Sequence, residues 1–185
     1  MKSLATFWRT MEGKGKPSQL ERYTAKGSTE HILRFIQLGG GPKMGVTCEE
    51  YARHHFTCLK KRRSGKETGY DHILEHTELP VAQEIEQKSS GHWGENDYKW
   101  QHVEAKHNWK FLLLCGIDYT ELKFWCMDRR TFEHLITEKK ITNQGNKTGD
   151  SSEGMWFNYL DVKDSLVEVP TDELLIAYVK SSLAS

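Results

Sequence analysis

The spacing of apolar residues in the N-terminal part of the chain predicts helices. Between Thr29 and Leu38, apolar residues recur at helical spacing, and the run stops at the glycines and proline of residues 39–42. Thr6–Met11 is a second helix candidate. We therefore expect an N-terminal helical segment over residues 1–45, followed by a main unit over residues 46–185.

The main unit opens with a capping pattern. Thr47 is followed at the third position by Glu50, and this capping box predicts a helix that runs from there to about Leu59. Glu49 lies at helical spacing from the apolar stripe of this segment and is predicted to face inward, whereas Glu50 faces outward. The stripe consists of Ala52, Phe56 and Leu59.

The rest of the chain alternates between strand-like and helix-like patterns. Short apolar or alternating runs predict strands at Tyr70–Leu74, Val81–Lys88, Phe111–Cys115, Leu122–Met127 and Met155–Tyr159. Helical spacing predicts helices at Tyr98–Lys106, Thr131–Lys139 and Thr171–Leu183. Polar stretches with glycine predict loops at Ser89–Asn96 and Asn143–Gly154. This order predicts an α/β fold with a central mixed sheet flanked by helices.

Composition limits the class of protein without choosing a function. The 185 residues are 37% hydrophobic and 28% charged, with a formal net charge of zero, which is typical of an ordinary globular domain. No apolar run is long enough to span a membrane, and the N-terminus lacks a signal-peptide pattern. The four cysteines form no C-x-x-C pair, so we expect reduced thiols in a cytoplasmic protein.

The predicted strand Val81–Lys88 carries the most suggestive chemistry. Alternation places Glu86 and Lys88 side by side on one face, where the carboxylate can hold a divalent cation and the ammonium can orient water or neutralise charge on a phosphate. Asp71 lies in the preceding predicted strand, and a hairpin would bring it to Glu86 as a second metal ligand. Glu49 could supply a further ligand, directly or through water.

The spacing of an acid and a lysine two residues apart is weak evidence alone, because it recurs. Only the pair at Glu86 ends an alternating strand, follows a strand with an aspartate and comes after a helix with an inward glutamate. Asp97 with Glu104 and Lys106 is the main rival, but that segment fits a helix better. Further occurrences begin, for example, at Glu12, Glu138 and Asp161.

These residues resemble the core of PD-(D/E)xK nucleases, in particular of type II restriction endonuclease-like proteins. The resemblance covers roughly residues 45 to 135 and rests on GYDHIL, EIEQKSS and the aromatic-rich segment that leads into Phe111–Asp118. It implies that Asp71 and Glu86 bind metal, that Lys88 is the catalytic lysine and that Glu49 is the helix glutamate. Tyr70 stands where the family often has proline, and Gln87 where an apolar residue is more usual.

The resemblance implies a magnesium-dependent DNA endonuclease, with manganese as a substitute, that cuts at a defined sequence. We expect double-stranded DNA as the substrate, a homodimer, and no nucleotide cofactor or membrane partner. A structure-specific repair or recombination nuclease and a non-catalytic DNA-binding module remain alternatives. The side chains expected to contact DNA are Lys60, Lys61, Arg62 and Arg63, from a basic turn over Lys60–Lys66, and Gln101.

Histidines and tryptophans are assigned less specific roles. His54 and His55 are adjacent, and His72 with His76 lacks a supporting pair at ligand spacing, which argues against a zinc site. Packing in the core or in loops is the expected role of the tryptophans Trp93, Trp100, Trp109 and Trp125.

Overall fold

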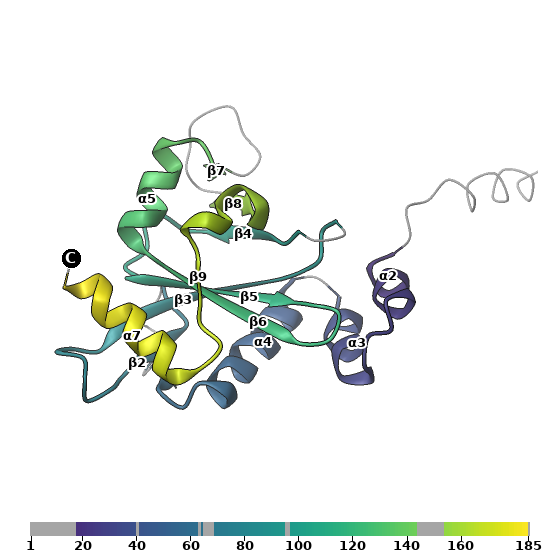
Figure 1. Ribbon diagram of the computed structural model, residues 1–185, viewed down its shortest axis with the longest axis horizontal. Helices are drawn as coiled ribbons and strands as arrows, with labels where there is room; N and C mark the ends of the chain where they lie inside the picture. Colours follow the sequence, from purple (N-terminus) through teal and green to yellow (C-terminus); the bar gives the residue numbers. More distant parts are fainter. Residues whose placement is uncertain are drawn as a thin grey trace, which may run out of the picture.

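A computed structural model describes residues 18–39, 41–62, 64, 69–94, 97–143 and 154–184. The expected helix at Thr6–Met11, most of the expected loop at Asn143–Gly154, and Arg63 lie outside this part of the chain. The described residues form an α/β fold with a mixed central sheet and flanking helices, as predicted (Figure 1).

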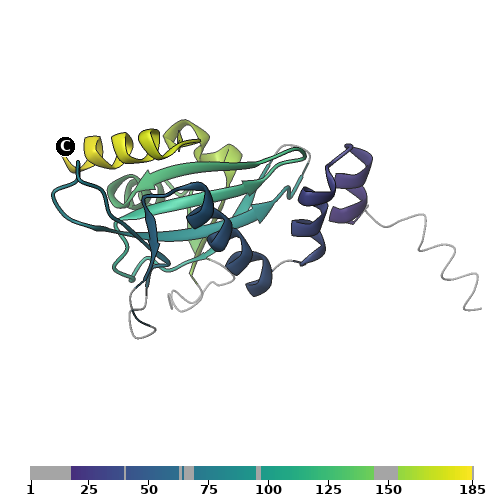
Figure 2. The same cartoon turned by 90° about the horizontal axis from the view of Figure 1, so that it is seen from below.

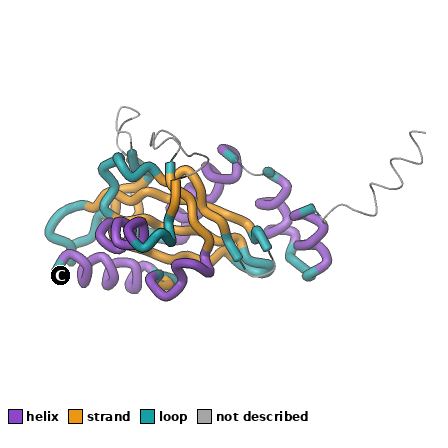
Figure 3. Tube along the Cα trace, turned by 90° about the horizontal axis from the view of Figure 1, so that it is seen from above, coloured by secondary structure: helices purple, strands orange, loops and turns teal. Residues whose placement is uncertain are grey.

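Two short helices begin the described chain. α2 (Gln19–Ala25) starts with a capping box in which Ser18 and Glu21 bond to each other's backbone N–H groups. α3 (Glu30–Gln37) begins at the cap Thr29, whose side chain accepts a hydrogen bond from Ile32, and confirms the helix predicted from apolar spacing. Both helices lie at one end of the sheet (Figures 1 and 3).

The next helix begins earlier than the capping pattern predicts. α4 (Pro42–His55) starts at Pro42, after Gly41 with its φ of 99°, and Thr47 lies inside the helix with its hydroxyl bonded to the Lys43 carbonyl. Proline is well suited to a first helical position because it lacks an N–H group that would need a partner there. The predicted start at Thr47 and end at Leu59 are therefore wrong. The expected division at residue 45 falls within α4.

Six strands form the larger sheet, in the order β1-β2-β3-β5-β6-β9. Neighbouring strands are antiparallel except for β3 and β5, which run parallel. The strands are β1 (Leu59–Lys61), β2 (His72–Leu74), β3 (Gln83–Gly91), β5 (Phe111–Ile117), β6 (Leu122–Asp128) and β9 (Val167–Glu168). The strands predicted around residues 70–74, 81–88, 111–115 and 122–127 are confirmed.

A second sheet accounts for the largest error in the predicted elements. The predicted helix Tyr98–Lys106 is instead the strand β4 (Lys99–Val103), which pairs with β8 (Met155–Asn158), which in turn pairs with β7 (Thr142–Asn143). The predicted loop at Ser89–Asn96 is also wrong at its start, because Ser89–Gly91 continue β3 beside Cys115–Ile117 of β5. The short α6 (Tyr159–Val162) and the 3-10 helix η2 (Lys163–Ser165) follow β8.

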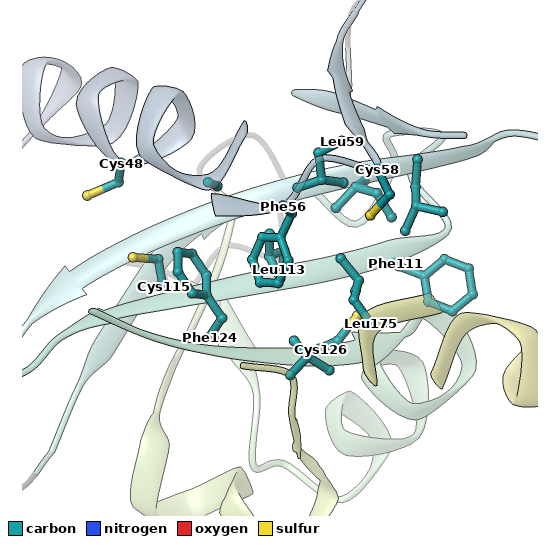
Figure 4. Close-up of a cluster of buried hydrophobic side chains, with 14 of the residues drawn as sticks. Cys48, Phe56, Cys58, Leu59, Phe111, Leu113, Cys115, Phe124, Cys126 and Leu175 are labelled. Carbon is teal, nitrogen blue, oxygen red and sulfur yellow. The ribbon is translucent and has the colours of Figure 1, made fainter. Parts of the chain in front are cut away.

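The two faces of the larger sheet are covered by different layers. α4 and α7 (Asp172–Leu183) lie on one face, while β4, β8 and α5 (Arg129–Thr137) lie on the other (Figures 1 and 2). We call the two buried layers the α4-side core and the β4-side core. Side chains from α4, β5, β6 and α7 meet in the α4-side core, among them Phe56, Leu113 and Leu175 (Figure 4). Tyr23, Ile32 and Ile36 of the N-terminal helices belong to this core.

Three tryptophans and all four cysteines are buried, as expected for packing residues. The buried tryptophans, at most 5% exposed, are Trp100, Trp109 and Trp125 of the β4-side core. Cys48, Cys58, Cys115 and Cys126 are free thiols. No helix in the described part of the chain has the length and apolar character needed to cross a membrane.

One carboxylate ties the C-terminal helix to the rest of the fold. Asp172, in the first turn of α7, accepts hydrogen bonds from the Thr57 backbone N–H at 3.0 Å, the Thr57 hydroxyl at 2.7 Å and the Cys58 N–H at 3.2 Å. Burial alone would raise the pKa of Asp172, but these hydrogen bonds outweigh it and hold the pKa below its ordinary value. The ionised form is therefore the one that stabilises the folded chain.

Asp172→Ala is expected to destabilise the protein by about 1–3 kcal/mol at pH 7, because it leaves donors of the Thr57–Cys58 turn without an acceptor. A depressed pKa stabilises the fold above the ordinary carboxyl range, so this difference should shrink as the pH falls below about 4. Urea unfolding at several pH values measures it. Asp164→Ala, at an exposed aspartate of η2, is the matched control, and equal losses in both variants would contradict the expectation.

Candidate active site

The strand β3 places Glu86 and Lys88 on the same face, as its alternation predicts. Glu86 and Lys88 pair with Leu112 and Leu114, which belong to the β4-side core, whereas Ile85 pairs with Phe111 of the α4-side core. The Lys88 ammonium lies 2.6 Å from Glu86 Oε1, and the side chains are 22% and 8% exposed. This ion pair is therefore shielded from water far more than an ordinary surface pair.

Asp71 lies one residue before β2, against the middle of β3. Its N–H donates to the Ile85 carbonyl at 2.9 Å, and its Oδ2 accepts from the Gln87 N–H at 2.9 Å. The antiparallel pairing of β2 with β3 thus brings Asp71 next to the strand that carries Glu86, as the sequence predicts. The two carboxylates interact, because the charge on Asp71 adds to burial in raising the pKa of Glu86, against the lowering effect of Lys88.

Glu49 joins this group from α4. Burial, followed by the charge of Asp71, raises the pKa of Glu49 from its ordinary 4.5 to about 7; Arg53 and Lys88 oppose this rise, and Glu86 adds to it. Glu49 lies close to Asp71 and Lys88, because the three side chains line the same cavity. The prediction that Glu49 faces inward is confirmed, since its side chain is 26% exposed. Three separate segments therefore bring four charged groups together.

A cavity of about 720 Å³ opens over this group. Glu49, Asp71, Gln87 and Lys88 line it, together with the first turn of α4 and the residues at the end of β3. Gln101, expected to contact DNA, also lines the cavity, from β4 rather than from a helix. Volumes in this range are typical of ligand sites, so the charged group lies in a space that a substrate can enter.

A buried polar chain, which the sequence did not reveal, supports the three segments. Arg53 of α4 donates to His72 Nδ1 at 3.1 Å, and His72 Nε2 bonds to Gln87 Oε1 at 2.8 Å. Gln87 in turn donates to the Ser89 hydroxyl at 3.3 Å. Burial lowers the pKa of His72 to about 4, so a neutral ring accepts from Arg53 and donates to Gln87 at neutral pH. Gln87, at a position where an apolar residue is more usual in PD-(D/E)xK nucleases, thus connects β3 through His72 of β2 to Arg53 of α4.

The residues expected to contact DNA fall into two groups. Lys60 and Lys61 belong to the strand β1, so the predicted basic turn is wrong at its start. Both are exposed. Arg62 donates to the Tyr70 carbonyl at 3.4 Å, and its charge lowers the pKa of Glu86, which places it beside the site. Arg63 lies outside the described residues.

Asp71 and Glu86 are the candidate metal ligands that the structure brings together. Among the described residues, no group of three or more His, Cys, Asp or Glu side chains is arranged to hold a metal ion. Asp71 and Glu86 remain as neighbouring oxygen donors. Comparison of the chain with protein-family models, curated proteins and solved structures found no match.

Glu49→Gln is expected to change how stability depends on pH. The pKa of Glu49 is higher in the folded chain than in the unfolded chain, so its contribution to stability is complete below about pH 4.5 and is lost as the pH rises through about 7. The metal-free variant should therefore become more stable than the original protein across this range, by about 1–3 kcal/mol at pH 8.

Urea unfolding in EDTA between pH 4.5 and 8.5 measures this difference. Glu50→Gln, at the exposed neighbouring glutamate, is the control and should leave the pH dependence unchanged. A difference between Glu49→Gln and the original protein that stays constant with pH would contradict the raised pKa.

Proposed function

We propose that this protein is a metal-dependent DNA endonuclease of the PD-(D/E)xK type. The observation that carries the proposal is that Glu49 of α4, Asp71 before β2 and Lys88 of β3 line one cavity, where Lys88 is bonded to the buried Glu86. These are the residues, in the order helix glutamate, aspartate, glutamate and lysine, to which the resemblance assigns catalysis.

The carboxylates suit a hard divalent cation. Mg²⁺ is commonly bound by one or two carboxylates, with water and substrate phosphate completing its shell, so a pair of acids is a sufficient protein contribution. Asp71 and Glu86 would hold the ion, with Glu49 assisting directly or through water. Burial raises the pKa values of Glu49 and Glu86, and the charge of Asp71 adds to the rise in both; a bound cation would favour their ionised forms. When bound, Mg²⁺, or Mn²⁺ in its place, would polarise the scissile phosphate and activate water.

The chain's own residues then have separate tasks. Lys88 donates to Glu86 Oε1 at 2.6 Å; with Glu86 holding a cation, Lys88 would be available to hold a water or a phosphate oxygen. Gln87 and His72 keep β3 in register with β2, so that Asp71 and Glu86 stay side by side. Lys60, Lys61 and Arg62 supply positive charge for the DNA backbone. A homodimer would place one such site on each strand of a DNA duplex.

The test is digestion of mixed-sequence plasmid DNA with purified protein, in Mg²⁺ and in EDTA. Discrete fragments that form in Mg²⁺ but not in EDTA would support a sequence-specific endonuclease. Cleavage confined to branched or nicked DNA would support the structure-specific alternative on the same site. DNA binding without cleavage in Mg²⁺ or Mn²⁺ would overturn the catalytic proposal in favour of a binding module.

A further inference from the structure

A tryptophan at the rim of the cavity has no packing role in the core. Trp93 follows the end of β3 and is 66% exposed, whereas Trp100, Trp109 and Trp125 are at most 5% exposed. It lines the same cavity as Lys88. A flat aromatic side chain at the rim of a cavity offers a face on which the ring of a ligand can stack.

The backbone under Trp93 is held in place from several directions. The Trp93 N–H donates to the Asp97 carbonyl at 2.8 Å, and Arg22 of α2 donates to the Trp93 carbonyl at 3.2 Å. Gln19 and Arg22 also donate to the carbonyl of the preceding His92, whose buried ring bonds to Asp118 at 2.9 Å. The exposed ring therefore stands on a fixed base, as a binding platform requires.

A cation lies over one face of the Trp93 ring, which leaves the other face for a ligand. The Lys99 ammonium is 4.8 Å from the centre of the Trp93 ring and 3.9 Å from that of Trp156, and Lys99 also lines the cavity. An exposed indole face next to a fixed positive charge is the pair of features with which proteins bind unpaired nucleotides: the base stacks on the ring and the phosphate meets the cation. Within a duplex, neighbouring base pairs cover the faces of each base, so only an unpaired base can reach the ring.

We propose that Trp93 and Lys99 bind an unpaired nucleotide of the DNA substrate, so that the enzyme acts on DNA with a single-stranded segment next to the cut. This inference rests on the proposed nuclease function and narrows its substrate class. Trp93 lies five residues beyond Lys88, or about 16 Å along an extended chain. The stacked base therefore belongs to a nucleotide several positions from the phosphate at Lys88.

The experiment measures binding without cleavage. Fluorescently labelled DNA, as a short single strand, a duplex with an overhang and a blunt duplex, is titrated in EDTA with the original protein, Trp93→Ala, Trp93→Phe and Lys99→Met. Leu174→Ala, at an exposed leucine of α7 that does not line the cavity, is the control.

Trp93→Ala should weaken binding to the single strand and the overhang by roughly tenfold or more and leave the blunt duplex within about twofold. Trp93→Phe should keep most of the affinity, because it keeps an aromatic face. Lys99→Met should reduce the dependence of log K on log salt by about 0.7 for the single strand. Leu174→Ala should bind as the original protein does.

Unchanged binding of unpaired DNA by Trp93→Ala would overturn the inference, as would equal losses on all three substrates or no binding of unpaired DNA by the original protein. Because the assay contains EDTA, its outcome is independent of catalysis. Cleavage of DNA in Mg²⁺ together with unchanged binding by Trp93→Ala would overturn this inference alone. Binding of unpaired DNA that depends on Trp93, without cleavage of any DNA in Mg²⁺, would overturn only the proposed nuclease function.

Discussion

Lys88→Met is expected to lower the rate of DNA cleavage in Mg²⁺ by at least about a hundredfold, the usual effect of removing a group that stabilises charge at the reacting centre. Its ammonium is the one bonded to Glu86, and it lines the cavity with Asp71. The change keeps the length of the aliphatic side chain, so the walls of the cavity should persist. Initial rates on plasmid DNA measure the loss.

A matched control exists on the surface. Glu138 and Lys140 have the same spacing and form an ion pair at 2.9 Å, but both are more than a third exposed. Lys140→Met should therefore leave the rate unchanged. Lys88→Met leaves the carboxylate of Glu86 buried without its partner, which destabilises the fold. The double variant Glu86→Gln with Lys88→Met removes that unpaired charge. Circular dichroism shows whether each of the two variants is folded. Similar rates for Lys88→Met and Lys140→Met in folded protein would contradict the assignment of the catalytic lysine.

The grouping of Asp71, Glu86 and Lys88 could be predicted because its geometry is local. Because side chains alternate along a strand, Glu86 and Lys88 lie on the same face of any strand that contains both, independently of the rest of the fold. A short connection between two strand-like runs makes an antiparallel pair the natural outcome, and that pair sets Asp71 against Gln87. Helical spacing likewise fixes the side of α4 on which Glu49 lies.

Elements that depend on distant partners could not be predicted in the same way. Lys99–Val103 becomes a strand because β8, more than fifty residues later, supplies its hydrogen-bond partners. Ser89–Gly91 extend β3 because β5 runs beside them. The start of α4 predicted from the capping pattern at Thr47 was wrong for a local reason. The helix already begins at Pro42, after Gly41, so Thr47 lies in its second turn.

The supporting residues were hidden for a further reason. Arg53, His72 and Gln87 are polar residues that look like solvent-exposed positions until burial and mutual hydrogen bonds are known. In the sequence, Gln87 differs from the apolar residue usual in PD-(D/E)xK nucleases, but nothing there indicates a supporting role. Its alternation partner Ile85, on the α4 side of the sheet, was the one available sign that Gln87 points into the protein.

Trp100→Ala is expected to cost about 3–5 kcal/mol of stability, the range for removing a large buried aromatic side chain. Trp100 is 0% exposed and packs against Trp125 and Phe157, and its indole N–H donates to the Cys115 carbonyl at 3.1 Å. It is thus a main contact between β4 and the larger sheet. Since Lys99 and Gln101 flank it and line the cavity, the variant should also lose affinity for DNA.

Trp93→Ala is the natural comparison, because it removes the same type of side chain from an exposed position in the lining of the cavity. It should cost less than about 1 kcal/mol, chiefly the contact with Lys99. Urea unfolding of both variants separates the two roles of tryptophan: Trp100 builds the wall and Trp93 meets the ligand. If the two losses of stability were equal, β4 would not be held by Trp100, and the cavity wall would need another support.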